Sequence, residues 1–300
     1  MTTTLRLATR RSALALVQAR AAAAQIAAHH GSLQVEELLI TTSGDRFRDR
    51  PLQDIGGKGL FLKEIEQALL DGRADIAIHS MKDVPVDLAP GLTMAALPER
   101  ADPRDVLVSR TGGTVANLPR AAQVGTSSLR RRVQLLALRE DLNVVPLRGN
   151  VDTRLAKVDR GDVDATVLAA AGLHRLGLTE RATELLEPTH FLPAVGQGAL
   201  GIECRSDDDR VLELLAAMDH LPTRICVTAE RAFMEAVEGS CRMPVAAHCI
   251  RQGEQLWIRG MLAEEDGSRA RYGERRAGWP TELNVAAELG RELGVELRAQ

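Results

Sequence analysis

A cysteine in a polar loop is the residue of this chain best suited to covalent chemistry. Cys241 follows Gly239 and Ser240 and precedes Arg242, in a turn-rich stretch that gives a thiol no packing role. A neighbouring arginine favours the thiolate, which is the nucleophilic form. We therefore expect Cys241 to be a nucleophile or a covalent anchor. The other cysteines lie in apolar runs and are predicted to be small buried hydrophobic residues: Cys204, Cys226 and Cys249.

The stretch His79–Pro85 combines an imidazole, a cation and a carboxylate directly after a short apolar segment, residues 75–79. We predict that this segment is a strand, and ligand sites in open α/β sheets form beyond the carboxyl ends of strands. A carboxylate there, Asp83, could stabilise a developing cation or transfer protons. A Lys82–Asp83 surface pair before a proline turn is the alternative interpretation.

Arginines follow a turn and hydroxyl groups in the stretch Gly125–Arg132. The N–H groups at a helix start, with Ser128 beside them, can bind an anion. Three arginines in the first helical turn repel one another and the positive end of the helix dipole, which predicts a bound anion that offsets the repulsion. A solvated basic face is the alternative.

Arginines recur at similar positions elsewhere. Arg148 and Arg154 flank a second strand-to-helix turn, Arg10 follows the first predicted strand, and Arg175 adds another. Because arginine suits paired contacts with oxyanions, the recurrence predicts a substrate with several carboxylates or phosphates. For any one of them, a surface ion pair is the simpler explanation.

Two glycine-rich segments complete the motifs. Asp54–Gly59 lacks the spacing and the Ser/Thr of a phosphate-binding P-loop. Its glycines around Lys58 predict either a mobile lid, around residues 42–59, or a flexible surface loop. The second segment, Ala194–Ala199, is predicted to be a close-packed crossover between domains.

Alternating strands and helices are predicted to position these residues, in two similar halves. The first half has strands at 4–9, 33–41 and 75–79, and helices at 12–31 and 60–70. The second has strands at 106–109, 123–125, 143–147 and 164–169, and helices at 128–139 and 151–160. Such alternation predicts parallel sheets with helices on both faces. The stretch Pro98–Pro103 is predicted to be a hinge between the halves.

The pattern changes after Pro244. Alternating polar and apolar residues predict a three-stranded antiparallel meander, at 245–251, 255–262 and 268–274. A final amphipathic helix begins at about Glu282. We interpret this region as a third, α+β domain, with Cys241 on the loop that leaves a helix at 224–238.

Composition narrows the classes of function. With 300 residues, 45% hydrophobic and 26% charged, the chain suits a globular protein of two or three domains. A net charge of −3 and 2% aromatic residues argue against nucleic-acid and membrane partners. The four cysteines show no zinc-ligand spacing, so no metal is expected. No signal peptide is recognisable, which predicts a cytoplasmic protein.

Together these motifs are similar to those of the hydroxymethylbilane synthase family, also called porphobilinogen deaminase. The matches run in order along nearly the whole chain: Leu7–Arg10, Gly56–Phe61, His79–Pro85, Gly125–Arg131, Leu147–Asn150, Leu192–Gly198 and the Cys241 loop. At that loop the family has glycine before the cysteine and often glutamine after it, where this chain has Ser240 and Arg242.

The resemblance implies two α/β domains like those of type II periplasmic binding proteins and a small α+β C-terminal domain with a three-stranded antiparallel sheet. It also implies that the chain returns to the first sheet after the second domain. We therefore predict that residues 1–98 and 192–217 form domain 1, that 99–191 form domain 2 and that 218–300 form domain 3, in a monomer.

The resemblance further implies a dipyrromethane cofactor joined to Cys241 through a thioether. Four porphobilinogen molecules would be condensed on it head to tail with loss of ammonia. Water would then release hydroxymethylbilane, in tetrapyrrole biosynthesis.

The site residues follow the family motifs. The predicted catalytic residues are Asp83, Lys82 and Arg10. The predicted cofactor-binding residues are Cys241, Ser128, Arg130, Arg131, Lys82 and Asp83. The predicted substrate-binding residues are Arg10, Arg148, Arg154, Arg175, Phe61, Lys58 and Ser80.

Two other functions fit parts of the sequence. One is a sensor of small anions, although a binding protein has no need of a loop cysteine. The other is a cysteine hydrolase that pairs Cys241 with His248 or His79, although the sequence shows no oriented thiol–imidazole pair.

Overall fold

The computed structural model describes residues 3–31, 33–42, 62–238, 243–264 and 266–300. The predictions for Lys58, Phe61, Cys241 and its neighbours, and for the lid, lie outside these residues, apart from Thr42 at the lid's edge. None of the helices in the described part of the chain has the length and apolar character that crossing a bilayer requires.

The chain divides into two compact units, Met1–Arg100 with Ala199–Arg224, and Ala101–Gly198 with Ile225–Gln300. The first boundary falls inside the stretch Pro98–Pro103. The finer division into three domains stays a prediction.

The sheet of the first unit has the strand order β2-β1-β3-β10-β4. Its strands are β1 (Thr3–Arg10), β2 (Leu33–Ile40), β3 (Ile76–Ser80), β4 (Leu92–Ala96) and β10 (Leu200–Arg205). Strand β1 is parallel to β2 and β3, whereas β10 is antiparallel to β3 and β4. The three strands predicted for this half are parallel to one another, as expected, but the complete sheet is mixed, because β10 enters from a distant part of the chain and runs in the opposite direction.

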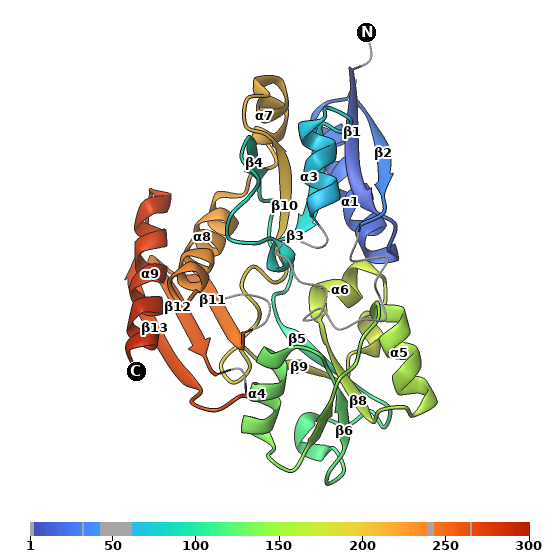
Figure 1. Ribbon diagram of the computed structural model, residues 1–300, viewed down its shortest axis with the longest axis vertical. Helices are drawn as coiled ribbons and strands as arrows, with labels where there is room; N and C mark the ends of the chain where they lie inside the picture. The colour runs from blue at the N-terminus through green and yellow to red at the C-terminus, as the bar shows by residue number, and fades with distance from the viewer. Residues whose placement is uncertain (1–2, 32, 43–61, 239–242, 265) are drawn as a thin grey trace. The chain divides into compact units, whose positions relative to one another are not determined.

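Helices cover both faces of this sheet, as predicted (Figure 1). On one face lie α1 (Ala13–His29) and α7 (Asp209–Ala216), which bury apolar residues such as Ile26 and Leu215. On the other lies α3 (Lys63–Leu70), with Ile65 and Leu69 in the core. Helix α1 begins where expected because the Ser12 hydroxyl accepts a hydrogen bond of 3.3 Å from the Ala15 N–H.

The sheet of the second unit repeats this arrangement, with the order β7-β6-β8-β5-β9. Its strands are β5 (Asp105–Ser109), β6 (Gln123–Gly125), β7 (Asn143–Val145), β8 (Ala165–Ala169) and β9 (Glu184–Leu186). Strand β6 is parallel to β7 and β8, and β5 is antiparallel to β8 and β9. Helix α4 (Leu129–Leu138) covers one face, and α5 (Val151–Arg160) and α6 (Ala170–Arg175) cover the other.

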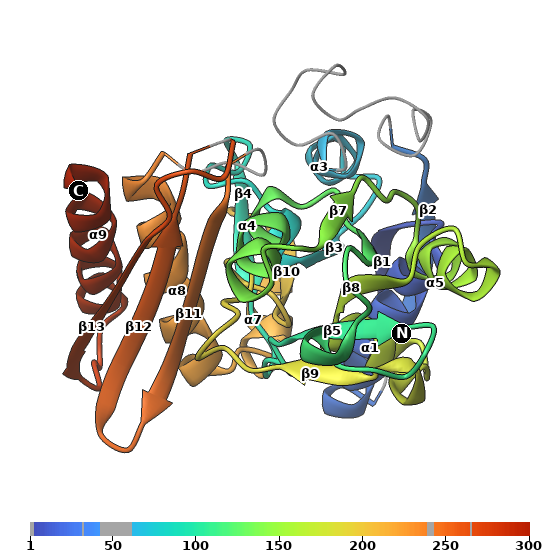
Figure 2. The same cartoon turned by 90° about the horizontal axis from the view of Figure 1, so that it is seen from below.

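The C-terminal part is the predicted antiparallel meander of β11 (Val245–Gln252), β12 (Gln255–Leu262) and β13 (Arg271–Gly278). Strand β13 begins three residues later than expected. The residues before it belong to a turn, which is closed by the 3.0 Å bond from the Glu264 N–H to the Ser268 carbonyl. Helices α8 (Leu221–Ala236) and α9 (Leu283–Ala299) pack on one face of this sheet (Figure 2).

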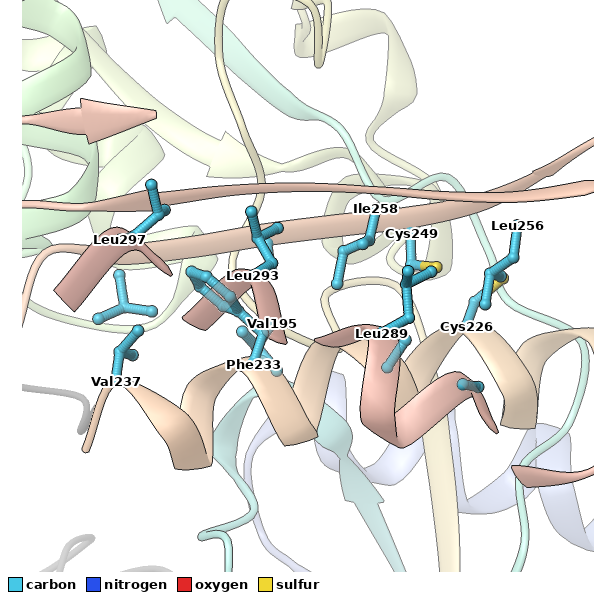
Figure 3. Close-up of a cluster of buried hydrophobic side chains, with 14 of the residues drawn as sticks. Val195, Cys226, Phe233, Val237, Cys249, Leu256, Ile258, Leu289, Leu293 and Leu297 are labelled. Carbon is cyan, nitrogen blue, oxygen red and sulfur yellow. The ribbon is translucent and has the colours of Figure 1, made fainter. Parts of the chain in front are cut away.

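The core between these helices and the sheet is mostly aliphatic, with Phe233 among Val, Leu and Ile side chains (Figure 3). Cys226 and Cys249 are buried there, and Cys204 is buried in the first unit. The prediction that these three cysteines are small buried hydrophobic residues is confirmed.

Candidate functional site

Asp83 lies on a short 3-10 turn, Met81–Asp83, that directly follows β3. The Met81 N–H donates to the Ala199 carbonyl at 3.1 Å, and the buried Met81 side chain lies under Gly201. A Cβ at Gly201 would lie 2.5 Å from the Met81 sulfur, so a larger residue there would require the Met81 side chain to shift. The turn is therefore anchored to β10 through Met81, while the Asp83 side chain is exposed.

Two hydrogen bonds hold the end of β3 itself. Gln18, buried on α1, donates to the Ser80 hydroxyl at 3.2 Å. On the other side of the strand, the ring of His79 and the carboxylate of Glu203 meet at 2.8 Å, both buried. This bond joins β3 to β10 inside the first unit, which is a structural role for His79.

Arg10 ends β1, which is the parallel neighbour of β3. Ala8 pairs with Ala77. Two residues further along both strands, the same register places Arg10 beside His79. The carboxyl ends of the two strands thus bring Arg10 to the edge of the sheet from which the Asp83 turn begins.

In the second unit, the predicted arginines gather at the carboxyl ends of three adjacent parallel strands. Ser128 follows β6 and caps α4, accepting a 3.4 Å bond from the Arg131 N–H. Arg148 follows β7, and Arg175 ends α6 directly after β8. The strand order β7-β6-β8 therefore brings these residues to one edge of the sheet.

Arg130 and Arg131 have an internal counter-ion. Arg130 donates to Asp105 Oδ2 at 2.7 Å, and Arg131 donates to Oδ1 at 2.7 Å through one terminal nitrogen and at 3.1 Å through Nε. All three side chains are buried. The repulsion at the start of α4 is thus offset by a carboxylate of the chain itself, and not by the bound anion that we predicted as the offsetting charge.

The charges of this cluster are unequal. Two guanidinium groups face one carboxylate, so the three side chains together carry one positive charge (2 − 1 = 1). Burial alone would raise the pKa of Asp105, but the attraction of Arg130 and Arg131 and their hydrogen bonds hold that pKa well below its usual range. The carboxylate is therefore ionised at neutral pH, and the excess positive charge is suited to a carboxylate ligand.

Arg154 and Arg175 both donate to backbone carbonyls. Arg154 Nε donates to Gly149 at 2.9 Å, which folds the side chain around the start of α5. Arg175 donates to Gly198 at 2.8 Å, and burial lowers its pKa. Their roles in substrate binding stay predictions.

Sequence reasoning missed Asp105, which holds the arginines of α4. The available signal was an aspartate directly before the apolar run Val106–Val108, which is typical of a buried strand. Charged residues are rarely fully buried unless they are paired, so this position indicated an ionic partner without identifying it.

The repeated strand order, with ligand-suited side chains at strand carboxyl ends, is that of type II periplasmic-binding-protein-like α/β units, here with an α+β C-terminal part. The fold-class prediction is confirmed. Among solved structures, the methionine-binding protein MetQ is 14% identical with a TM-score of 0.45, over 72% of this chain and 89% of that one. The strand order, and not this likeness, defines the fold.

The chain belongs to the porphobilinogen deaminase family. The family model described as the dipyromethane cofactor binding domain of porphobilinogen deaminase matches residues 5–213, and its C-terminal domain matches residues 224–299. A porphobilinogen deaminase of Sorangium cellulosum is 59% identical, over 99% of both chains. One of Nitratidesulfovibrio vulgaris is 51% identical, over 98% of this chain and 92% of the relative. The predicted family, enzyme class and dipyrromethane cofactor are confirmed.

Proposed function

We propose that this chain condenses four porphobilinogen molecules head to tail, with loss of ammonia, and releases hydroxymethylbilane by hydrolysis. The dipyrromethane, attached through Cys241, supplies the primer on which the chain is built. The observation that supports this most directly is an exposed carboxylate, Asp83, on a fixed turn at the sheet edge where Arg10 also ends. We further propose that the chain acts in the cytoplasm and, as its family resemblance implies, as a monomer.

The arginines supply the binding part of this function. Porphobilinogen carries an acetate and a propionate, so every added unit brings two carboxylates. Arg148, Arg154 and Arg175 would bind them in the second unit, and Arg130 and Arg131 with Ser128 would hold those of the cofactor. A site that keeps a growing polycarboxylate needs a fixed tether, which is the role that we assign to Cys241.

Asp83 supplies the chemical part. Loss of ammonia breaks the carbon–nitrogen bond of the aminomethyl group and leaves positive charge shared with the pyrrole nitrogen, which a carboxylate stabilises. The new carbon–carbon bond then releases a proton from the attacked pyrrole carbon, and the same carboxylate is suited to accept it. Lys82 and Arg10 would orient the carboxylates of the substrate beside Asp83.

Replacing Asp83 by alanine tests this role. We expect Asp83→Ala to lower kcat for hydroxymethylbilane formation by about 10²–10⁴-fold, the usual contribution of a positioned acid–base group, while the KM for porphobilinogen changes little. Asp87→Ala is the matched control, because Asp87 is an exposed aspartate four residues away in the same loop. Near-normal turnover of Asp83→Ala in single-turnover and steady-state assays would show that our role for Asp83 is wrong.

A further inference from the structure

The glycine-rich turn before β10 holds a buried glutamine at its centre. Gln197 is 1% exposed, and its side-chain amide donates to the Pro103 carbonyl at 2.7 Å and to Asp105 Oδ1 at 3.1 Å. A Cβ at Gly198, where φ is +89°, would lie 2.4 Å from the Ala101 carbonyl. The turn is thus packed backbone to backbone against the chain that leads into β5, as its glycines predicted.

Gln197 contacts the carboxylate that organises the arginine cluster. The Oδ1 atom that accepts from Gln197 also accepts both bonds from Arg131, and Oδ2 accepts from Arg130. Besides Asp105, each arginine has a backbone partner. Arg130 donates to the Leu192 carbonyl at 2.6 Å, and Arg131 donates to the Val167 carbonyl at 2.8 Å. The orientation of one carboxylate therefore sets the position of two guanidinium groups, and Gln197 fixes that orientation.

The same turn is bonded to the elements on either side of Cys241 in the sequence. The Gly196 N–H donates to Glu230 Oε2 at 2.7 Å, and the Cys249 N–H donates to Glu230 Oε1 at 2.8 Å. Glu230 is fully buried on α8, which ends shortly before Cys241, and Cys249 lies on β11, which begins shortly after it. Residues 196–197 thus link these elements to the arginine cluster, within one compact unit.

We propose that Gln197 is a positioning residue, which aligns Arg130 and Arg131 through Asp105 with the cofactor attached at Cys241. This proposal rests on the proposed function, because it takes these arginines to bind the carboxylates of the cofactor. A ligand tethered covalently at one end cannot shift to compensate for a misplaced site at the other. Functional groups must then be held to within about 0.5 Å, which requires a buried support such as this one.

The test compares Gln197→Met with Thr183→Val. Methionine keeps the length of glutamine and removes both of its donor bonds. Thr183→Val is the matched control, because the Thr183 hydroxyl contacts two carbonyls of the same unit, those of Leu107 and Gly113, each at 3.1 Å. The cofactor-free chain is mixed with porphobilinogen, and growth of the dipyrromethane adduct is followed by intact mass. The Tm of each cofactor-free chain is measured in parallel.

We expect both variants to lower Tm, and Gln197→Met alone to slow cofactor loading, by about 10–100-fold, the cost of misplacing a binding group by an ångström. Its KM for porphobilinogen should rise less than its loading rate falls. Gln197→Glu should load more slowly still, because a second carboxylate beside Asp105 cancels the positive charge of the cluster. If Gln197→Met does not fold, cofactor loading of Gln197→Glu is compared with that of Thr183→Val instead.

Loading of Gln197→Met at the rate of Thr183→Val would overturn the positioning role and leave the proposed function intact. A wild-type chain that never acquires the adduct would overturn the proposed function as well, so the two failures are distinguishable.

Discussion

Asp105 is a single residue on which two buried arginines depend. Removing one partner of a buried ion pair leaves the other charges uncompensated, which typically costs about 3–5 kcal/mol. We expect Asp105→Asn to lower the free energy of unfolding at pH 7 by an amount toward the lower end of this range, because asparagine keeps one acceptor oxygen. Urea unfolding measures the change. Asp162→Asn, which alters the exposed pair of Asp162 with Arg160, should change it little.

Asp105 should also make the free energy of unfolding depend on pH. The pKa of Asp105 is lower in the folded chain than its unfolded value of about 3.9, so its contribution is fully present above that pH and is lost as the pH falls through the folded pKa. The difference in unfolding free energy between the wild type and Asp105→Asn should therefore be constant above about pH 5 and shrink below about pH 4. A difference that stays constant down to pH 2 would contradict the depressed pKa.

Residue types alone predicted some of the buried residues. The apolar neighbours of Cys204, Cys226 and Cys249 were enough to predict their burial, because burial of a small thiol needs only a local apolar pattern. The partner of Arg130 and Arg131 could not be predicted in this way. Asp105 lies 25 residues earlier, and an aspartate that starts a strand has the same local pattern whether it faces water or a guanidinium group.

Among the elements, helices α8 and α9 are in close backbone contact at Gly290. A Cβ there would lie 2.0 Å from the Ala229 carbonyl, a backbone atom that cannot turn away. Gly290→Ala gains about 1 kcal/mol of helix propensity, but separating the two helices costs more, typically about 1–3 kcal/mol for an overpacked core and more against backbone. We expect a net loss of stability in thermal and urea unfolding.

Gly278→Ala is the control for that substitution, because a Cβ at Gly278 meets no atom within 4 Å. It should leave the unfolding free energy within about 0.5 kcal/mol. A Gly290→Ala chain as stable as Gly278→Ala would mean that the two helices do not cross this closely.

The elements with strong periodicity were predicted with bounds close to those observed, such as α5 at Val151–Arg160 and β12 at Gln255–Leu262. The missed elements are short: β4, β9, α6 and α7 have between three and eight residues. A pattern of that length does not distinguish a strand from a loop. Nor does a local pattern carry strand direction, which is why the antiparallel β10 and β5 were unexpected.

At the scale of the whole molecule, two sheets with one strand order are built from different stretches of the chain. The alternation of strands and helices predicted two α/β halves. The return of the chain as β10 came only from the family resemblance, because strand pairing across more than a hundred residues has no local signal. Within the second unit, apolar contacts of Val133 and Leu192 with Ala246, Met261 and Ala263 join the C-terminal sheet to the α/β part.

The covalent primer is the feature on which the proposed function depends, and its mass is directly measurable. Intact mass spectrometry of the purified chain should show an adduct of two pyrrole units on the wild type and none on Cys241→Ala, which should also fail to form hydroxymethylbilane. Cys226→Ala, which alters a buried thiol of the same unit, should keep the adduct. An unmodified mass in fully active wild-type protein, or an adduct that persists in Cys241→Ala, would contradict the anchoring role of Cys241.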